Sequence, residues 1–402
     1  MGANYLGELG DGTYNNTNRP EMIVANSVTA IGSGIAHTLF LKSDGSLWAM
    51  GDDSQGELGD GKDNNTNRPE VIVASNVTAV SAGGIHSLFL KSNGSLWAMG
   101  WNESGQLGDG TFNTTNLPEQ IVASNVTAIS AGGFHSLFLK SDGSLWAMGD
   151  NENGELGDGT DNNTNRPEMI VASNVTAIAG GDQFSLFLMK DGSLWAMGDN
   201  GSGELGDGTF GDSSPIYSTN VPEQIVASNV MAIAAGESHS LFLKSDGSLW
   251  ATGDNEFGEL GDGTYNNTDR PEMIVANSVT AIAAGDGYSL FLKSDGSLWG
   301  MGHNYNGQLG DGTDNNTNLP EQIVAGPPGY NQIAIQLLSG GGVSLSFVGM
   351  AGTNYELDWS ASLSPVNWVP QVTNPAGAGG ILVFTNTPNP TTTNFWRIRS
   401  VP

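Results

Sequence analysis

The sequence predicts an all-β protein built from a repeated four-stranded unit, followed by a smaller β domain. Three observations support this. The motif LGDG occurs seven times, beginning at residues 9, 58, 107, 156, 205, 260 and 309. Successive copies are 49 residues apart, except for one interval of 55 residues. Each unit consists of short runs rich in Val, Ile, Leu, Phe and Trp, split by Gly, Asn, Asp and Ser. Near residue 325 the repeat ends and a different alternating pattern begins.

A unit of this kind predicts a propeller blade. We expect four strands within residues 118–149, namely 119–122 (EQIV), 126–130 (VTAIS), 135–140 (HSLFLK) and 144–149 (SLWAMG). Asp142 and Gly143 suit a tight hairpin turn that needs positive φ. The third strand is apolar on both faces, as in sheets that stack between neighbours. Four-stranded units that cannot bury both faces alone, repeated in series, predict a β-propeller.

Units such as HSLFLKSDGSLWAMGDNENGELGDGT at 135–160 carry a family resemblance. They resemble the repeats of the regulator of chromosome condensation (RCC1) family, whose usual ring has seven blades. The resemblance covers roughly residues 1–325. It implies the fold more than a function, because the family includes a nucleotide-exchange factor, a light receptor and a secreted enzyme inhibitor. The basic tail expected of a chromatin-binding member is missing from this chain.

The number of blades is open between six and seven. SLW occurs six times, whereas LGDG and the following PE occur seven times, and Met1-Gly2 aligns with the MG that ends each unit. Six repeats are therefore complete, with partial units at both ends. A seventh blade is either absent, assembled from the ends, or lost from a larger secreted gene product, and we expect the last.

The remainder of the chain predicts a separate module. We assign residues 1–325 to the propeller, 326–332 to a Pro/Gly linker and 333–402 to a small β-sandwich. The last segment resembles the C-terminal all-β module of many secreted bacterial proteins. That resemblance implies an extracellular or cell-surface location, with surface attachment or self-assembly through the module.

Composition excludes several partner classes. Lys and Arg number 13 against 42 Asp and Glu, and the formal charge of −29 repels nucleic acid and anionic membranes. Without cysteine, the chain forms no disulfide and no thiolate metal site. No apolar run approaches the roughly 18 residues of a membrane span. The first residues lack the basic and apolar regions of a signal peptide.

The acidic loops and the histidines favour structural roles. An EF-hand calcium loop fails on Asp150, Glu152 and Gly154, because ligands are too few and the glycine is misplaced. Asp158 is expected to bond loop amides. Four histidines share a repeat position that holds Phe or Tyr in other units, which favours packing: His37, His86, His135 and His239. We predict no catalytic group, metal or cofactor.

Glu and Arg vary together along the chain. Four units with Glu before LGDG have Arg eleven residues later, whereas Gln106 and Gln308 are followed by Leu117 and Leu319. Glu204 is the exception, because a six-residue insertion places Val221 at the matching position. Loss of both charges together is what paired charges predict, because one buried charge left alone is costly. We therefore predict structural salt bridges Glu57–Arg68, Glu155–Arg166 and Glu259–Arg270.

Function is expected where the repetition fails. The departures are the insertion within 210–223, Trp101 and the residues 303–305. The candidate partner-binding residues are Trp101, Phe112, Phe210, Ile216, Tyr217, His303 and Tyr305, all in or beside inter-blade loops; the alternative is loop drift after duplication. We predict a non-enzymatic, extracellular or surface-associated scaffold that binds a protein or glycan partner. The alternative is a polysaccharide-active enzyme with a site built from non-repeated loop residues.

Overall fold

The computed structural model describes residues 1–210, 218–326, 333–337, 343–348, 354–360, 369–375, 381–386 and 395–401. The chain divides into two compact units. The first is Met1–Leu292 with Trp299–Ile323, and the second is Lys293–Leu298 with Val324–Pro402. All regular elements in these ranges are strands, which confirms the all-β prediction. The expected linker, apart from Gly326, lies outside the described residues.

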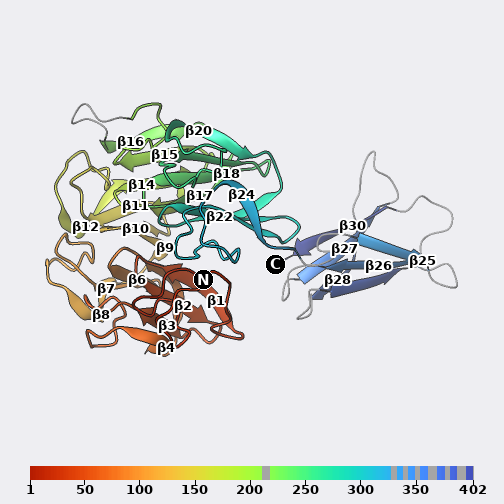
Figure 1. Ribbon diagram of the computed structural model, residues 1–402, viewed down its shortest axis with the longest axis horizontal. Helices are drawn as coiled ribbons and strands as arrows, with labels where there is room; N and C mark the ends of the chain where they lie inside the picture. Colours follow the sequence, from red (N-terminus) through yellow and green to blue (C-terminus); the bar gives the residue numbers. More distant parts are fainter. Residues whose placement is uncertain are drawn as a thin grey trace. The chain divides into compact units, whose positions relative to one another are not determined.

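The larger unit consists of six four-stranded antiparallel sheets, the blades of a propeller (Figure 1). The first contains β1 (Val28–Ser33), β2 (His37–Lys42), β3 (Leu47–Gly51) and β4 (Thr66–Val73). The second contains β5 (Val77–Ala82), β6 (His86–Lys91), β7 (Leu96–Gly100) and β8 (Thr115–Val122). The third contains β9 (Val126–Ala131), β10 (His135–Lys140), β11 (Leu145–Gly149) and β12 (Thr164–Val171).

The remaining three blades repeat this order of strands. The fourth contains β13 (Val175–Gly180), β14 (Phe184–Met189), β15 (Leu194–Gly198) and β16 (Thr219–Val226). The fifth contains β17 (Val230–Ala235), β18 (His239–Lys244), β19 (Leu249–Gly253) and β20 (Thr268–Val275). The sixth contains β21 (Val279–Ala284), β22 (Tyr288–Lys293), β23 (Leu298–Gly302) and β24 (Thr317–Val324).

Strand existence was predicted correctly, but one assignment to a blade was wrong. Residues 119–122 belong to β8, which pairs with β7 of the second blade, Glu119 lying opposite Ala98. The cause is the long loop after β7, which brings the chain back along the same sheet. The hairpin prediction is confirmed, since Gly143 has a φ of 77° and Asp142 Oδ1 accepts a hydrogen bond from the Ser144 N–H at 3.0 Å.

Adjacent blades bury each other's apolar faces. In the first interface Leu39, Leu41 and Leu47 pack against Val77 and Phe89 of the next blade. The same arrangement recurs at the four interfaces that follow. The second strand of an inner blade is buried on both faces, as predicted for residues 135–140, which form β10. Each blade therefore needs a neighbour on both sides.

A buried hydrogen-bond chain joins blade to blade. His37 Nε2 lies 2.9 Å from Ser87 Oγ, which donates its only hydrogen to the Glu57 carbonyl at 2.7 Å. The imidazole N–H must then be the donor to the hydroxyl. His86, His135 and His239 make the same contact with the next blade. Burial lowers the pKa of His135 to about 4, so the ring is neutral near pH 7.

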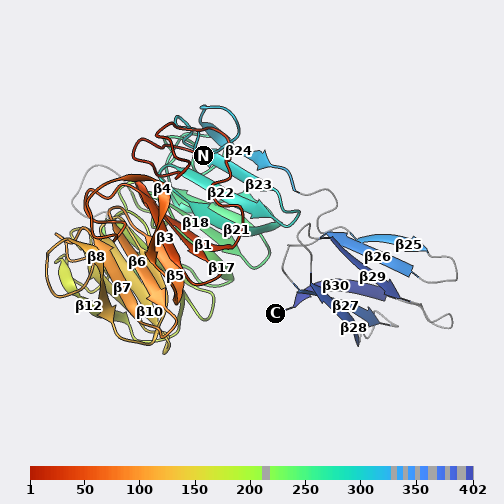
Figure 2. The ribbon, with the colours of Figure 1, turned by 90° about the horizontal axis from the view of Figure 1, so that it is seen from below.

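The second unit contains two three-stranded antiparallel sheets, which Figure 2 shows separately. One has the order β25 (Ile333–Leu337), β26 (Val343–Val348), β29 (Ile381–Asn386). The other has the order β28 (Val369–Pro375), β27 (Asn354–Ser360), β30 (Phe395–Val401). Side chains from both sheets form one apolar cluster: Leu345, Phe384, Tyr355, Leu357 and Ile398.

The fourth blade has Phe184 at the position of His135. Replacing His135 with Phe should lower the free energy of unfolding at pH 7.5 by about 1 kcal/mol, because a buried hydrogen bond is lost. The pKa of His135 is about 4 when folded and 6.5 ordinarily, so below pH 6.5 the unfolded chain binds the proton and the wild type loses stability. The disadvantage of H135F should vanish by about pH 5.5. Denaturant titrations at several pH values test this, and parallel acid sensitivity of the two proteins would contradict it.

Candidate functional site

The sequence suggested that the long repeated loops join one blade to the next, but each connects the third and fourth strands of a single blade. These long loops and the short turns between the first two strands of each blade lie at one end of the propeller. The backbone ties them together, because the Trp101 N–H donates to the Ile85 carbonyl at 3.0 Å and the His303 N–H to the Gly287 carbonyl at 2.7 Å. We call this end the loop face. The described candidates Trp101, Phe112, Phe210, His303 and Tyr305 all belong to these loops.

The acidic and amide side chains of the loops form hydrogen bonds that hold the loops together. Asn151 Nδ2 donates to Asp158 Oδ1 at 3.1 Å, and that oxygen also accepts the Thr160 N–H at 2.8 Å. The Asn151 Oδ1 accepts the Leu156 N–H at 3.0 Å. Among the described residues, no group of three His, Asp or Glu side chains is placed to hold a metal ion. The structural interpretation of Asp158 is therefore confirmed.

The predicted Glu–Arg salt bridges do not form. The glutamates and arginines of the three predicted pairs, all among the described residues, are not within salt-bridge distance of each other, whereas Lys62 Nζ lies 2.7 Å from Asp60 and 3.5 Å from Glu70. Glu155 is buried, and its Oε2 accepts the Asn153 N–H at 3.0 Å, while its Oε1 has no hydrogen-bond partner. Burial is the main cause that raises the pKa of Glu155 to about 8. A protonated carboxyl is isosteric with the amide of Gln106 at the same position, which explains why either residue fits.

The arginines lie one loop away from their expected partners. The guanidinium of Arg166 lies against Gly110 of the preceding loop, which contains Gln106 rather than Glu155. The same displacement places Leu117 against Gly61, in the loop that contains Glu57. The pairs Glu57–Arg68 and Glu259–Arg270 are likewise unbridged in the structure. Co-variation eleven residues apart along the chain thus records the shared ancestry of the units and not a contact.

The candidate aromatic residues form two groups and two separate positions. The half-buried Trp101 packs edge-on against Phe134, with ring centroids 5.4 Å apart. His303 stacks on Phe257 at 4.4 Å, and Tyr305 meets the His303 ring edge-on at 5.1 Å.

Phe112 and Phe210 are exposed at separate loop tips. Ile216 and Tyr217 lie outside the described residues.

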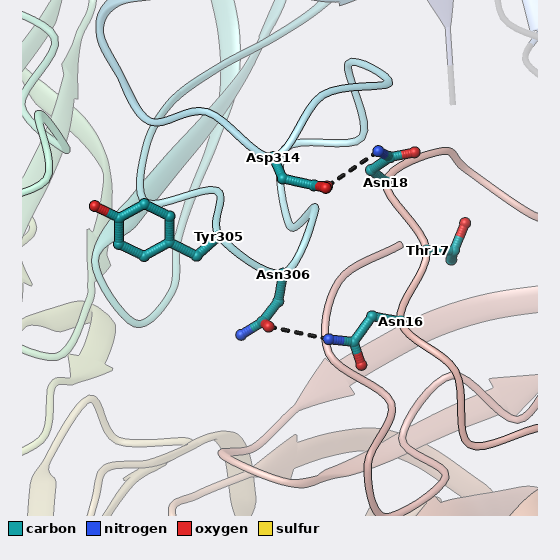
Figure 3. A pocket seen from close by; sticks show the side chains of 6 residues that line it. All are labelled: Asn16, Thr17, Asn18, Tyr305, Asn306 and Asp314. Atoms are coloured by element: carbon teal, nitrogen blue, oxygen red, sulfur yellow. Dashed lines mark hydrogen bonds between the residues drawn. The ribbon is translucent and has the colours of Figure 1, made fainter.

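A polar pocket of about 290 Å³ lies where the segment before β1 meets the last loop of the sixth blade (Figure 3). Asn306 Oδ1 accepts hydrogen bonds from Asn16 Nδ2 at 3.0 Å and from the Tyr5 hydroxyl at 3.1 Å. Asn18 Nδ2 donates to Asp314 Oδ1 at 3.0 Å. We call this the junction pocket, lined by Asn16, Thr17, Asn18, Tyr305, Asn306 and Asp314.

Half of the loop face carries carboxylates that sequence reasoning missed. The turn position after the repeated glycine holds Asp182, Glu237 and Asp286 in the fourth to sixth blades, but Gly84 and Gly133 in the second and third. These turns are adjacent, since the Asp182 N–H donates to the Glu237 carbonyl at 3.3 Å. With the first residue of the neighbouring loops they form the acidic rim: Asp150, Asp182, Asp199, Glu237, Asp254 and Asp286.

The carboxylates of the acidic rim interact strongly. A side-chain hydrogen bond with Asp286, followed by burial and the charges of Asp286, Asp182 and Asp254, raises the pKa of Glu237 to about 8. Burial and then the charges of Asp286, Asp150 and Asp199 raise the pKa of Asp182. The rim therefore retains a proton near neutral pH. A cation that binds there should displace it.

The short turns on the other half of the loop face carry no carboxylate. Its turns hold the exposed Ile35 and the half-buried Ile85 and Phe134, with Trp101 packed beside Phe134. The turns of blades one to three thus present apolar side chains and glycine where those of blades four to six present carboxylates, while the loops of blades one and three keep Asp52 and Asp150. A repeat protein gains direction from such a difference, because identical groups around a ring cannot orient one partner.

The fold and the loop face define an RCC1-type β-propeller. The family profile described as RCC1-like domain matches residues 72–348, and two profiles of the regulator of chromosome condensation (RCC1) repeat match residues 44–90 and 28–57. The first match covers more than half of the chain, so the chain belongs to the RCC1-like domain family. No curated protein matches the chain.

Several solved structures share the fold. Human WBSCR16 is 22% identical with a TM-score of 0.71, over 80% of this chain and 92% of that one. Prp20p from Saccharomyces cerevisiae is 23% identical with a TM-score of 0.73, over 83% of this chain and 87% of that one. At such identity the likeness concerns the fold alone. In the described part of the chain, no helix is long and apolar enough for a membrane span.

Replacing Glu155 with Gln should raise the free energy of unfolding, by an increment that grows by about 1.4 kcal/mol per pH unit between pH 4.5 and 8. The reason is that the raised pKa of Glu155 keeps it protonated when folded, while the unfolded chain ionises. R166L should give the same change in the wild-type and E155Q backgrounds. A double-mutant cycle in denaturant measures the coupling, and a value above about 0.5 kcal/mol would restore the contact that the structure lacks.

Proposed function

We propose that this protein is a non-enzymatic scaffold that binds a basic segment of a partner protein through its loop face. Membership of the RCC1-like domain family supports a protein-binding role. Among the proteins with a similar fold, yeast Prp20p binds Gsp1p and histones, and in a second structure the same yeast protein is bound to Kap60. For this chain we propose protein binding in general, and not binding to those particular partners.

The observation that carries the proposal is the division of the loop face into an acidic and an apolar half. Asp182, Glu237 and Asp286 lie in neighbouring turns, and their proximity contributes to the raised pKa values of Asp182 and Glu237, which a structural role does not require. Gly84 and Gly133 form the equivalent turns without a carboxylate. A segment with cations beside an apolar residue would neutralise one half and cover the other.

The distribution of the few cations reinforces this charge pattern. Four lysine ammonium groups lie over tryptophan rings, with Nζ 3.6 to 3.9 Å from the ring centroids: Lys42, Lys91, Lys140 and Lys244. These lysines end the second strand of their blades, so they lie at the end opposite the loop face. Their charge does not neutralise the acidic rim locally. With a net charge of −29, long-range attraction also favours a basic partner.

The junction pocket supports a glycan ligand more than an enzyme. Tyr305 is 66% exposed beside the amides of Asn16, Asn18 and Asn306, a combination of ring and amide groups that suits a sugar. Glycoside hydrolysis needs two carboxyl groups about the bond. The pocket lining contains one, Asp314, and Asn18 already donates to it. Glycan binding therefore stays a secondary prediction, tested by a glycan array with Y305A as the negative variant.

The C-terminal unit has a separate role in this proposal. Its two sheets share the cluster of Leu345, Tyr355, Leu357 and Phe384, which supports a β-sandwich module. An extracellular or surface location and self-assembly through this module remain predictions. Fractionation of cells that express the full-length gene product tests the first of these. Sedimentation of this chain with and without residues 324–402 tests the second.

Neutralising the rim with D182N, E237Q and D286N together should weaken binding of a lysine-rich peptide by about tenfold or more at 50 mM salt, because three carboxyl groups that attract the lysines are lost. Isothermal titration calorimetry or fluorescence anisotropy measures the change. The matched control is D142N, D191N and D246N, which removes three carboxyl groups at the opposite end. Those turns should remain intact, because Asn93 Oδ1 already accepts the Ser95 N–H at 3.0 Å in the second blade. Equal weakening in both variants would show mere attraction to net charge.

Binding of the lysine-rich peptide should also strengthen with pH. Since the pKa of Glu237 is about 8, the free rim holds a proton at pH 7 that the peptide must displace. Linkage then predicts up to about tenfold tighter binding at pH 9 than at pH 7, with most of the gain below pH 8. E237Q should remove that dependence. A wild-type affinity that is flat between pH 7 and 9 would disprove the role of this carboxyl.

A further inference from the structure

Three aromatic rings from two neighbouring blades meet on the loop face. Phe257 lies in the loop after β19, and His303 and Tyr305 lie in the loop after β23. The His303 ring stacks on Phe257, with centroids 4.4 Å apart and an angle of 25° between the planes. The Tyr305 ring stands nearly perpendicular to both, with its centroid 5.1 Å from His303 and 6.4 Å from Phe257. We call these three residues the aromatic corner.

The aromatic corner exists because several positions depart from the repeat together. Phe257 stands where the other five blades have Gln, Ser or Asn, Tyr305 where they have Ser, Glu or Gly, and His303 where four of them have Asp. Gly287, with a φ of 66°, makes room for the stack, since a Cβ there would lie 3.0 Å from Phe257 Cδ2 and 3.3 Å from His303 Cβ. The equivalent residues of the first five blades all have a side chain: Ala36, Ile85, Phe134, Gln183 and Ser238. Four separate changes thus contribute to one contact.

Two carboxyl groups border the aromatic corner. The His303 N–H donates to the Gly287 carbonyl at 2.7 Å, which fixes the corner beside Asp286 of the same turn. On its other side this turn meets the turn of the fifth blade, where the Glu237 N–H donates to the Gly285 carbonyl at 3.4 Å. The side chains of Glu237 and Asp286 are hydrogen-bonded to each other. An aromatic surface and a pair of carboxyl groups therefore lie side by side on the loop face.

The His303 ring does not repel a cation. Burial lowers the pKa of His303 from its ordinary value of 6.5, and the opposing effect of the Asp286 charge is smaller, so the ring is mainly neutral at pH 7. Its Nδ1 lies 3.1 Å from Gln308 Nε2 and accepts a hydrogen bond from that amide. The three rings of the aromatic corner therefore all present uncharged π systems, which attract a cation electrostatically.

The arrangement of the rings decides which cation they suit. Phe257 and His303 are stacked at 4.4 Å, which leaves no space between them to enclose an ammonium group. The open surface is the Tyr305 ring, which is 66% exposed. A guanidinium group is flat, so it can stack on an exposed ring while its N–H groups form parallel hydrogen bonds with a carboxylate. A lysine ammonium is a compact, strongly hydrated charge that gains less from this combination.

We propose that the aromatic corner, together with Asp286 and Glu237, binds an arginine side chain of the partner segment. This inference rests on the proposed function, and it specifies one residue that the basic segment must carry. The guanidinium stacks on the aromatic corner and donates to the two carboxyl groups. The remaining carboxylates of the acidic rim have no such cluster of rings beside them, so they attract lysine and arginine through charge.

Two peptides of equal charge separate this site from attraction to net charge. One is heptalysine, and the other is heptalysine with its central residue replaced by arginine. Isothermal titration calorimetry with the full chain should show binding about threefold to tenfold tighter for the arginine peptide. Y305A should reduce this preference to less than about twofold by weakening the arginine peptide alone, and it should fold because Tyr305 is exposed. Y305F should keep the preference, because the ring remains.

Three further variants locate the arginine. Y265A removes a tyrosine that is 53% exposed in the loop after β19, and as the matched control it should keep the preference. W101A disrupts the ring pair on the other half of the loop face and should also keep it. H303D restores the residue that four other blades have, so it should fold. It adds a carboxylate but removes a ring, so it should bind heptalysine more tightly while its preference for arginine falls.

The outcomes distinguish this inference from the proposed function. If the wild type binds neither peptide, or if D182N/E237Q/D286N binds both as tightly as the wild type, the proposed function fails and the arginine site with it. If both peptides bind equally well and depend on the acidic rim, the proposed function stands and the arginine site is overturned. A preference for arginine that survives Y305A and H303D, or that is lost in W101A instead, would place the guanidinium elsewhere and overturn the site as well.

Discussion

The contact of each blade with the next is the interaction on which the rest of this structure depends. A blade of four short strands has two apolar faces. Leu39 and Leu41 of the first blade and Phe89 of the second are buried only because the two blades pack together. The loops add a close approach, since a Cβ on Gly56 would lie 2.5 Å from the Asn116 backbone of the following blade, at a φ of 80°. Most of the recurring letters in the sequence serve this contact. They are therefore poor markers of function.

The same constraint determines which charges matter. Carboxyls beneath the loops, such as Glu155, Glu204 and Glu259, have pKa values raised to about 7 or 8 mainly by burial, so they are partly protonated near neutral pH. The carboxylate oxygens of the loop aspartates accept hydrogen bonds from backbone amides. The loop face differs from the rest of the surface because three of its six equivalent turns have acquired a carboxylate. The excess of acid in the composition thus overstates the number of carboxylates that can act.

Local patterns predicted the strands and the Asp142-Gly143 hairpin because their causes lie within a few residues. Properties that depend on the ring were harder to predict. Residues 119–122 were assigned to the wrong blade because a long loop, not strand adjacency, decides which sheet they join. The Glu155–Arg166 pair failed because co-variation along the chain does not reveal which unit lies beside which. Asp182, Glu237 and Asp286 could have been found by aligning the turns, but their proximity follows only from the order of blades around the axis.

The sixth blade carries two departures from the repeat. It supplies Asp286 to the acidic rim on the loop face. It has Tyr288 where four other blades have the histidine that bonds the next blade, so its link to a following neighbour has also diverged. A closed ring of identical units distributes strain and charge evenly and offers no unique surface. Divergence at single positions, such as Asp286 where the second and third blades have glycine, therefore gives one part of the ring a surface that the repeated residues cannot supply.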